Sequence, residues 1–226
     1  MNTNALAAPP AEFNFAQHLI RLNAGRQDKI ALIDDLGQLS YGQMAERIRR
    51  TANALRALGL RREERVLLLM HDSNDWITSF LGALYAGIVP VALNTLLTAE
   101  DYGYMLRNSR AQAALVSGAL LPTLQTALEQ GPHEVRHLLV SRPSQPLGPV
   151  DGLAVQDLET ALAASPAQAE PAQTLADEAA FWLYSSGSTG RPKGTVHTQG
   201  NLYWTATLYA QPVLGLTEAD TVFSAA

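Results

Sequence analysis

The chain alternates between short continuous apolar runs and segments in which apolar residues recur every three or four positions. The short runs, typical of buried strands, lie at 66–70, 88–93, 113–117 and 137–141. The amphipathic segments predict helices at 15–24, 41–58, 74–86, 98–108 and 119–129, with a hairpin at 29–39. Buried strands separated by helices predict an α/β fold with a mostly parallel sheet flanked by helices.

Local signals set several element boundaries. Ser40 and Gln43 match a capping box that begins the helix at 41, and Thr98 resembles a second helix cap. Gly87 is expected to end the helix before it. Pro90 cannot donate a ladder hydrogen bond, so it indicates either a sheet edge or a short ladder.

Three further segments have weaker patterns. Residues 142–152 are rich in Pro and Gly and are expected to form a loop. Residues 161–173 are rich in Ala and Pro and are expected to lie at the surface, partly as helix. The last apolar stretch, 221–226, is predicted to be a strand.

Composition narrows the class of protein. Of 226 residues, 47% are hydrophobic and 16% charged, a balance that excludes a disordered chain. Lys and Arg number 16 and Asp and Glu 21, so the net charge of −5 argues against a non-specific nucleic-acid binder. Without cysteine there is no disulfide, thiolate zinc site or cysteine nucleophile. With no secretory signal and no run of ~20 apolar residues, we expect a cytoplasmic protein without a membrane partner.

An aromatic-rich strand at 181–184 leads directly into a loop of small and hydroxylated residues, followed by a strand at 195–198 and a helix from about 200. Glycines let backbone N–H groups approach an anion and take positive φ, hydroxyls add donors, and lysine adds a mobile charge. A polyphosphate needs many such donors in one place, so the sequence predicts a phosphate-binding loop. Its residues are Ser185, Ser186, Gly187, Ser188, Thr189, Gly190, Lys193 and Gly194.

Other interpretations compete with these signals. Runs of Gly, Ser and Thr are most often flexible loops without a ligand, although such runs seldom follow an aromatic strand and end in Pro-Lys-Gly. A Walker P-loop requires G-x-x-x-x-G-K-[ST], and the match fails at Pro192 and at Gly194. His133 and His137 have the i, i+4 spacing of a metal-binding pair, but a solvated loop is the better interpretation there.

The stretch 184–194, Tyr-Ser-Ser-Gly-Ser-Thr-Gly-Arg-Pro-Lys-Gly, resembles the signature phosphate-binding loop of the acyl-adenylate-forming (AMP-binding) superfamily. Residues 39–44 and 81–91 resemble two further segments of that family, in the same order along the chain. Within the superfamily, residues 94–98, 101–104, 109–111 and 194–226 look like benzoate-CoA ligases. One position departs from the pattern: the family usually has His two residues before Asn201, and this chain has Gln199.

The resemblance implies a two-step reaction on an aryl carboxylate. ATP and Mg²⁺ would convert benzoate into an aroyl-adenylate and pyrophosphate, and coenzyme A would then displace AMP. The loop residues would bind the β- and γ-phosphates of ATP, and Lys193 would hold the leaving pyrophosphate or order the loop. Ala225 and Ala226 resemble the start of the segment that lines the acyl pocket, although simple strand packing explains two alanines equally well.

Members of this family are more than twice as long as this chain. The resemblance therefore implies that residues 1–226 are the N-terminal part of an AMP-binding domain, inactive alone, and that the unpaired edges favour association with another copy or chain. Two alternatives stay open. One is a stand-alone nucleotide-binding or scaffold module without catalysis, and the other is a ligase for a different aryl or fatty carboxylate.

Overall fold

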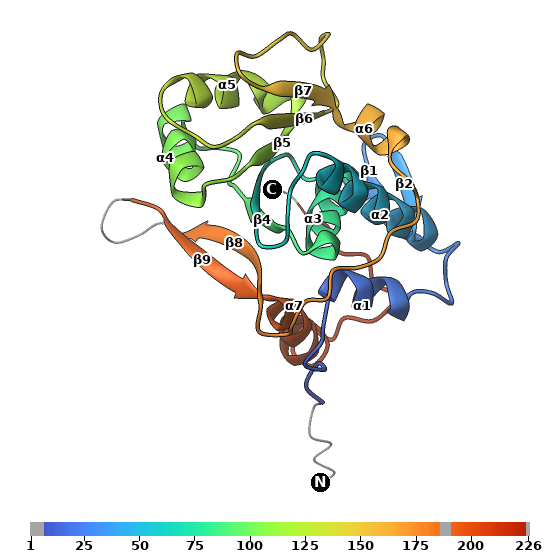
Figure 1. Cartoon of the computed structure of the whole chain (residues 1–226). Coiled ribbons are helices and arrows are strands. Elements are labelled where there is room, and N and C mark those ends of the chain that lie inside the picture. The colour runs from blue at the N-terminus through green and yellow to red at the C-terminus, as the bar shows by residue number, and fades with distance from the viewer. Residues whose placement is uncertain (1–6, 186–190, 225–226) are drawn as a thin grey trace.

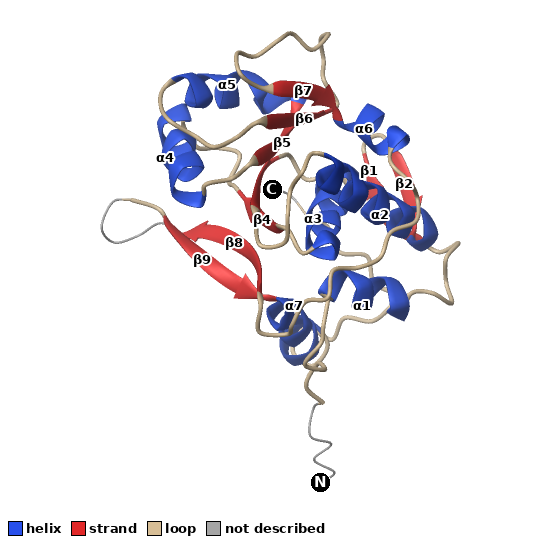
Figure 2. Cartoon of the chain, in the orientation of Figure 1, coloured by secondary structure: helices blue, strands red, loops and turns tan. Residues whose placement is uncertain are grey.

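The computed structural model describes residues 7–185 and 191–224, built around a seven-stranded sheet (Figures 1 and 2). The strand order is β7-β6-β5-β3-β4-β8-β9, and every neighbouring pair is parallel except β8 and β9, which form an antiparallel hairpin. The predicted α/β fold with a mostly parallel sheet is therefore confirmed. The strands are β3 (Arg65–Leu69), β4 (Val89–Ala92), β5 (Ala113–Ser117), β6 (His137–Ser141), β7 (Ala154–Asp157), β8 (Ala179–Ser185) and β9 (Lys193–Thr198).

Helices pack against both faces of the sheet. One core contains residues of α1 (Phe15–Leu22), α2 (Tyr41–Ala57), α3 (Asn74–Ala86) and α6 (Leu158–Ala164), and the other contains residues of α4 (Ala99–Ser109) and α5 (Leu121–Glu129). A separate hairpin of β1 (Ile30–Asp34) and β2 (Gly37–Ser40) lies against α2, and α7 (Gln199–Thr205) follows β9. Within the described residues, no helix is both long and apolar enough to span a bilayer.

Side chains alternate between the two cores along β3. Val66 and Leu68 lie in the first core, whereas Leu67 and Leu69 lie in the second, and all four are fully buried. A strand with helices on both faces has no solvated side, which is why its sequence is apolar throughout.

The signals at helix ends are confirmed. In the capping box of α2, the Ser40 hydroxyl accepts from the N–H of Gln43 at 3.3 Å, and the N–H of Ser40 donates to Gln43 Oε1 at 2.8 Å. Thr98 and Asp101 form the same reciprocal pair at the start of α4. Gly87 ends α3 with φ of 74°, in the left-handed region that glycine enters without strain.

Pro90 does not lie at a sheet edge, because β4 is placed between β3 and β8. Its other predicted consequence, a short ladder, is confirmed. β4 pairs with β8 only through Val91 and Ala92, whereas its pairing with β3 includes Pro90 and covers the whole strand. Because Pro90 has no N–H, it limits the ladder that β4 makes with β8, while the ladder with β3 is complete.

The helix expected in part of 161–173 is present as the end of α6, whereas β7 and the start of α6 lie in residues for which the sequence makes no prediction. Residues 154–164 form β7 and then α6, where the Asp157 carboxylate accepts from the N–H of Thr160 at 2.7 Å. β7 is an edge strand whose residues alternate in exposure, so it lacks a continuous apolar run. The predicted strand at 221–226 is wrong for 221–224, which has no ladder partner in the described part of the chain, and Ala225 and Ala226 lie outside that part.

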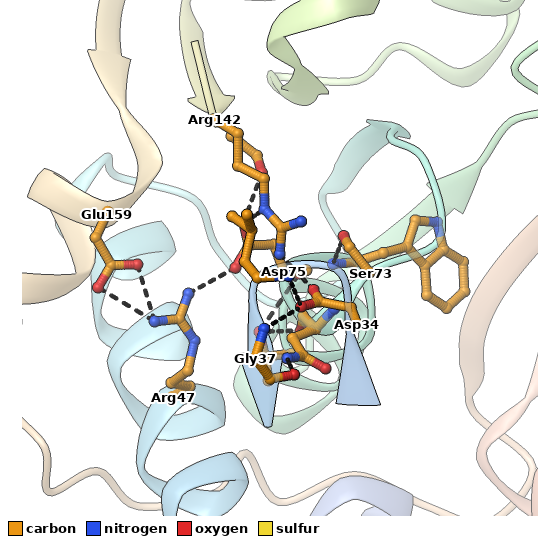
Figure 3. A network of polar contacts seen from close by, with 12 residues as sticks. Asp34, Gly37, Arg47, Ser73, Asp75, Arg142 and Glu159 are labelled. Atoms are coloured by element: carbon orange, nitrogen blue, oxygen red, sulfur yellow. Dashed lines mark hydrogen bonds and ion pairs between the residues drawn. The ribbon is translucent and has the colours of Figure 1, made fainter. Parts of the chain in front are cut away.

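Asp75, in the first turn of α3, lies at the centre of a polar network (Figure 3). Its Oδ1 accepts from Arg47 Nη2 at 2.8 Å, and its Oδ2 accepts from Ser141 Oγ at 2.7 Å and Arg142 Nε at 3.0 Å. Arg47 also pairs with Glu159 of α6 at 2.8 Å. Since the Asp75 and Arg47 side chains are mostly buried, the network joins α2, α3, α6 and the end of β6.

Asp34 joins the hairpin β1–β2 to this network. Its Oδ2 accepts from Arg142 Nη2 at 2.5 Å and from the N–H of Asn74 at 2.9 Å, and its Oδ1 accepts from the N–H groups of Leu36 and Gly37. Burial alone would raise the pKa of Asp34, but the Arg142 guanidinium and the backbone donors outweigh burial and hold this pKa below its ordinary value. The hairpin is therefore held by an ionised carboxylate.

Gln199, at the start of α7, holds the N-terminal helix. It is 1% exposed, and its Oε1 accepts from the N–H of Phe15 at 2.9 Å. Asn14 caps α1 and donates from its side-chain amide to the Leu84 carbonyl of α3 at 2.9 Å. The N-terminal segment is thus bonded both to α3 and to the residue that follows β9.

Replacing Asp34 with Asn should lower the free energy of unfolding by about 1–3 kcal/mol at neutral pH, because the amide offers one acceptor oxygen and no charge to Arg142. The folded-state pKa lies below the unfolded value of about 4, so this contribution is complete above that pH and is lost as the pH falls through the folded pKa. Urea unfolding at neutral and strongly acidic pH should show the difference shrink in acid. The exposed neighbour Asp35→Asn is the control, and a difference that does not depend on pH would contradict this role.

Replacing Gln199 with Leu should destabilise the chain by about 1–3 kcal/mol, because the N–H of Phe15 loses its acceptor. Thermal unfolding measures the loss, and hydrogen exchange should report faster opening of α1 before the rest of the chain. Gln168→Leu is a matched control, since that side chain is exposed and makes no hydrogen bond within the described residues. Equal unfolding midpoints for the two variants would contradict the assignment.

Candidate nucleotide-binding site

The predicted phosphate loop joins the two strands of the hairpin β8–β9 (Figure 1). Ser185 pairs with Lys193 and Tyr184 pairs with Gly194, so the strands stay in register up to both ends of the loop. Because directly opposite residues share a face, the exposed Ser185 and Lys193 side chains leave the hairpin on the same side. Two residues predicted from the sequence are thus brought together. Ser186, Gly187, Ser188, Thr189 and Gly190 lie outside the described residues.

The loop begins at the carboxyl end of a parallel strand. β8 is parallel to β4, and in open α/β sheets ligands bind outside the carboxyl ends of the strands. The sequence from 179 to 217 contains no Asp or Glu, while Arg191 and Lys193 lie near the end of the loop. The position in the sheet and the local positive charge both suit an anionic ligand.

Gly194 is explained by packing rather than by backbone conformation. Its φ is not positive, so the conformational freedom expected of a phosphate-loop glycine is not used at this position. A Cβ atom added to Gly194 would instead lie 3.3 Å from Cε3 of the Trp182 ring. The absence of a side chain lets the indole ring pack against the hairpin backbone.

Helix α4 contacts both ends of the loop. The Tyr184 hydroxyl donates to Asn108 Oδ1 at 2.7 Å, and the Arg191 guanidinium carbon lies 5.8 Å from the centroid of the Tyr104 ring. Burial raises the pKa of Tyr184 well above its ordinary value, and the neighbouring Tyr104 adds to the rise. The sequence points to Tyr104 only within the resembling segment 101–104 and does not select it or Asn108 for the site, and no local pattern connects either residue to the loop.

Gln199, the position that departs from the family pattern, has a defined contact in the structure. Its side chain points to α1 and is occupied by the N–H of Phe15, so its position is fixed by the N-terminal segment. His197, which precedes it on β9, stacks on the Phe181 ring with centroids 4.6 Å apart and is held in the hairpin. His197 therefore does not make the contact that Gln199 makes.

The predicted acyl-pocket residues Ala225 and Ala226 lie outside the described residues. Immediately before them, the Ser224 hydroxyl donates to the Asp72 carboxylate, while Val222 and Phe223 are 71% and 87% exposed. Earlier in this segment, Glu218 pairs with Arg26. The acyl-pocket assignment stays a prediction.

Two hollows lie elsewhere on the molecule. One, of about 300 Å³, is lined by residues of β1–β2 and of the polar network. The hairpin β1–β2 lies well apart from β8–β9 (Figure 1). The other hollow, of about 490 Å³, is lined in part by Glu129, His133 and Asp151. Across residues 7–185 and 191–224, no three His, Asp or Glu side chains gather closely enough to hold a metal ion. The interpretation of His133 and His137 as a metal pair therefore gains no support.

Comparisons with known proteins agree with the geometry of the hairpin. The family model of the AMP-binding enzymes matches residues 20–226. A benzoate–CoA ligase of Thauera aromatica is 46% identical over the whole chain, which covers 41% of that protein. A 4-hydroxybenzoate–CoA/benzoate–CoA ligase of Rhodopseudomonas palustris is 37% identical over 96% of the chain, which covers 39% of that protein. The chain thus spans about two fifths of the length of these relatives.

Solved structures show the same relationship. A benzoate CoA ligase from Burkholderia xenovorans LB400 matches 91% of the chain with 50% identity and a TM-score of 0.80, and 38% of that protein is covered. The anthranilate CoA ligase AuaEII, solved in complex with anthranoyl-AMP, matches 92% of the chain with 33% identity and a TM-score of 0.84, and 39% of it is covered. The sequence, the fold and the hairpin agree, and the chain belongs to the AMP-binding enzyme family.

Proposed function

We propose that the protein of which this chain forms part is a cytoplasmic aryl-CoA ligase that converts benzoate, ATP and coenzyme A into benzoyl-CoA, AMP and pyrophosphate. The observation that carries the proposal is the exposed pair of Ser185 and Lys193 at the open end of β8–β9. The pair stands at the carboxyl end of a parallel strand, in a part of the sequence that lacks acidic residues. Preference for an aryl carboxylate is supported by identity to ligases named for benzoate and hydroxybenzoate.

The reaction proceeds in two displacements. A benzoate oxygen attacks the α-phosphorus of ATP, the bond from that phosphorus to the bridging oxygen breaks, and pyrophosphate leaves. The coenzyme A thiol then loses its proton to solvent or a base, its sulfur attacks the aroyl carbonyl carbon, and AMP leaves. Both steps need orientation and charge neutralisation more than covalent participation by the protein.

The loop residues of this chain are proposed to bind the β- and γ-phosphates. The Ser185 hydroxyl would donate to a phosphate oxygen, and the Lys193 ammonium would offset charge that builds on pyrophosphate as it leaves. Ser186, Gly187, Ser188, Thr189 and Gly190 would complete the cradle with hydroxyl and N–H donors. Gly194 contributes by keeping Trp182 packed below the loop. Ala225 and Ala226 are proposed to border the flat aryl ring.

Magnesium is proposed to accompany ATP as its counter-ion. The described residues contain no group of acidic side chains that could ligate the ion, so we assign it no protein ligand in this chain. Its contribution would be to screen the negative charges of the phosphates, which lets the carboxylate approach the α-phosphorus.

The whole protein should catalyse benzoate-dependent exchange of pyrophosphate into ATP, because adenylation is reversible before coenzyme A enters. Benzoate should give a larger kcat/KM than acetate or a long-chain fatty acid, and 4-hydroxybenzoate is the close competitor to include. Faster exchange with a fatty acid would overturn the aryl assignment. Binding of ATP without exchange on any carboxylate would favour a nucleotide-binding module without catalysis.

Replacing Lys193 with Ala should slow adenylation on the order of tenfold to a hundredfold, because the ammonium group that offsets negative charge on the departing pyrophosphate is lost. The pyrophosphate exchange rate of the whole protein measures the effect, and circular dichroism should show an intact fold. Lys29, the other lysine in this sequence, provides the matched control, since Lys29→Ala removes the same charge far from the hairpin. Equal rates for the two variants would remove Lys193 from the mechanism.

A further inference from the structure

We propose that Tyr104 and Asn108 are positioning residues for ATP: they form a brace on α4 that holds both ends of the phosphate loop. The inference rests on the proposed phosphate-binding role of the hairpin β8–β9. Neither side chain has to touch ATP for the brace to act. It acts through Tyr184, immediately before Ser185, and through Arg191, two residues before Lys193.

The brace follows from helix geometry. Tyr104 and Asn108 are four residues apart on α4, so they lie one turn apart on the same face of the helix. That face meets the hairpin at two places, the Tyr184 hydroxyl and the Arg191 guanidinium. One rigid element is therefore in contact with the strand entering the loop and with the first residue described after it.

The contact before the loop is a directed hydrogen bond. The Tyr184 hydroxyl donates to Asn108 Oδ1 at 2.7 Å. The same hydroxyl lies 3.5 Å from the Met105 carbonyl. Tyr184 is the residue immediately before Ser185, so the bond fixes the strand where the predicted phosphate donors begin.

The contact after the loop is a cation–π interaction. The Arg191 guanidinium lies over the Tyr104 ring, within the separation at which such pairs attract. Arg191 is two residues before Lys193, so holding it restricts the chain that presents the lysine. A loop whose two ends are fixed before ATP arrives loses less conformational freedom on binding, and its affinity is higher for that reason.

If Tyr104 and Asn108 only stabilised the fold, removing their side chains would lower the stability of α4 and of the whole chain. α4 is already anchored by the buried side chains of Tyr102, Met105 and Leu106 and by the capping box of Thr98. Asn108 is exposed and Tyr104 is half-buried. Removing these two contacts should therefore leave α4 and the overall stability in place while the ends of the hairpin loosen.

Calorimetric titration of the 226-residue chain with MgATP and with tripolyphosphate tests the proposal. Asn108→Ala should weaken both ligands by about two- to tenfold, and Tyr104→Leu by about two- to fivefold. Tyr104→Phe keeps the ring and should restore the affinity, because the Tyr104 hydroxyl makes no hydrogen bond within the described residues. Tyr41→Leu is the matched control: it removes the comparable pair with Arg26, on the other side of the molecule.

A double-variant cycle separates the brace from general destabilisation. Tyr184→Phe and Asn108→Ala remove the same hydrogen bond, so the double variant should bind ATP no more weakly than either single variant. Hydrogen exchange without ligand supplies a second readout. Peptides covering 179–185 and 191–198 should exchange faster in Asn108→Ala and Tyr104→Leu, with the unfolding midpoint unchanged.

The outcomes distinguish this proposal from the proposed function. If the parent chain binds ATP and tripolyphosphate, and the variants bind them equally well, the brace is wrong and the phosphate-binding role stands. Unchanged exchange of the hairpin peptides in the variants also overturns the brace, whether or not ATP binds. A third outcome is that hydrogen exchange of the hairpin peptides rises in the variants, but the parent chain binds neither ligand. The hairpin is then braced, while the phosphate-binding role is overturned, and the role of the brace for ATP is overturned with it.

Discussion

Two residue pairs attach the phosphate hairpin to the parallel sheet. Val91 and Ala92 of β4 pair with Trp182 and Leu183 of β8, and Pro90 just before them has no N–H for a ladder. Two residue pairs thus join β8 to β4, whereas five pairs join β5 to β6. The geometry of the candidate site depends on what supplements this narrow junction.

Side chains on both faces of β8 supplement it. On one face, the Phe181 ring contacts the Phe80 ring of α3 edge-on at 5.3 Å and stacks on His197 of β9. On the other face, Trp182 and Tyr184 pack into the core that contains α4. At the far end of β9, Gln199 bonds to α1. The hairpin is thus held by packing against α3 and α4, and the hydrogen bond of Gln199 makes its position depend on the N-terminal segment as well as on the sheet.

The sequence predicts the parts of this structure that local rules control. Continuous apolar runs locate β3, β5 and β6, and the caps at Ser40 and Thr98 locate two helix starts, because each signal lies within a few residues. β7 is missed because an edge strand lacks a continuous apolar run. For Pro90, the sequence predicts either a sheet edge or a short ladder and cannot choose between them, since strand order is a property of the whole sheet.

The same limit applies to the site. The resemblance selects Ser185 and Lys193, and the hairpin register brings them together. Tyr104 and Asn108 lie about 80 residues earlier in the chain, and nothing local connects them to the loop. The role of Gln199 is likewise invisible in its surroundings, because its partner, the N–H of Phe15, comes from the other end of the chain.

The contact between Gly194 and Trp182 links two positions that a reader of the sequence would treat separately. Since a Cβ at residue 194 would lie 3.3 Å from the indole ring, a side chain there would press on the ring, and the preference for glycine depends on the size of the residue at 182. The two positions are therefore expected to vary together among related chains. A side chain at 194 would be accommodated where a smaller residue replaces the tryptophan, so an invariant glycine is not required at this end of the loop.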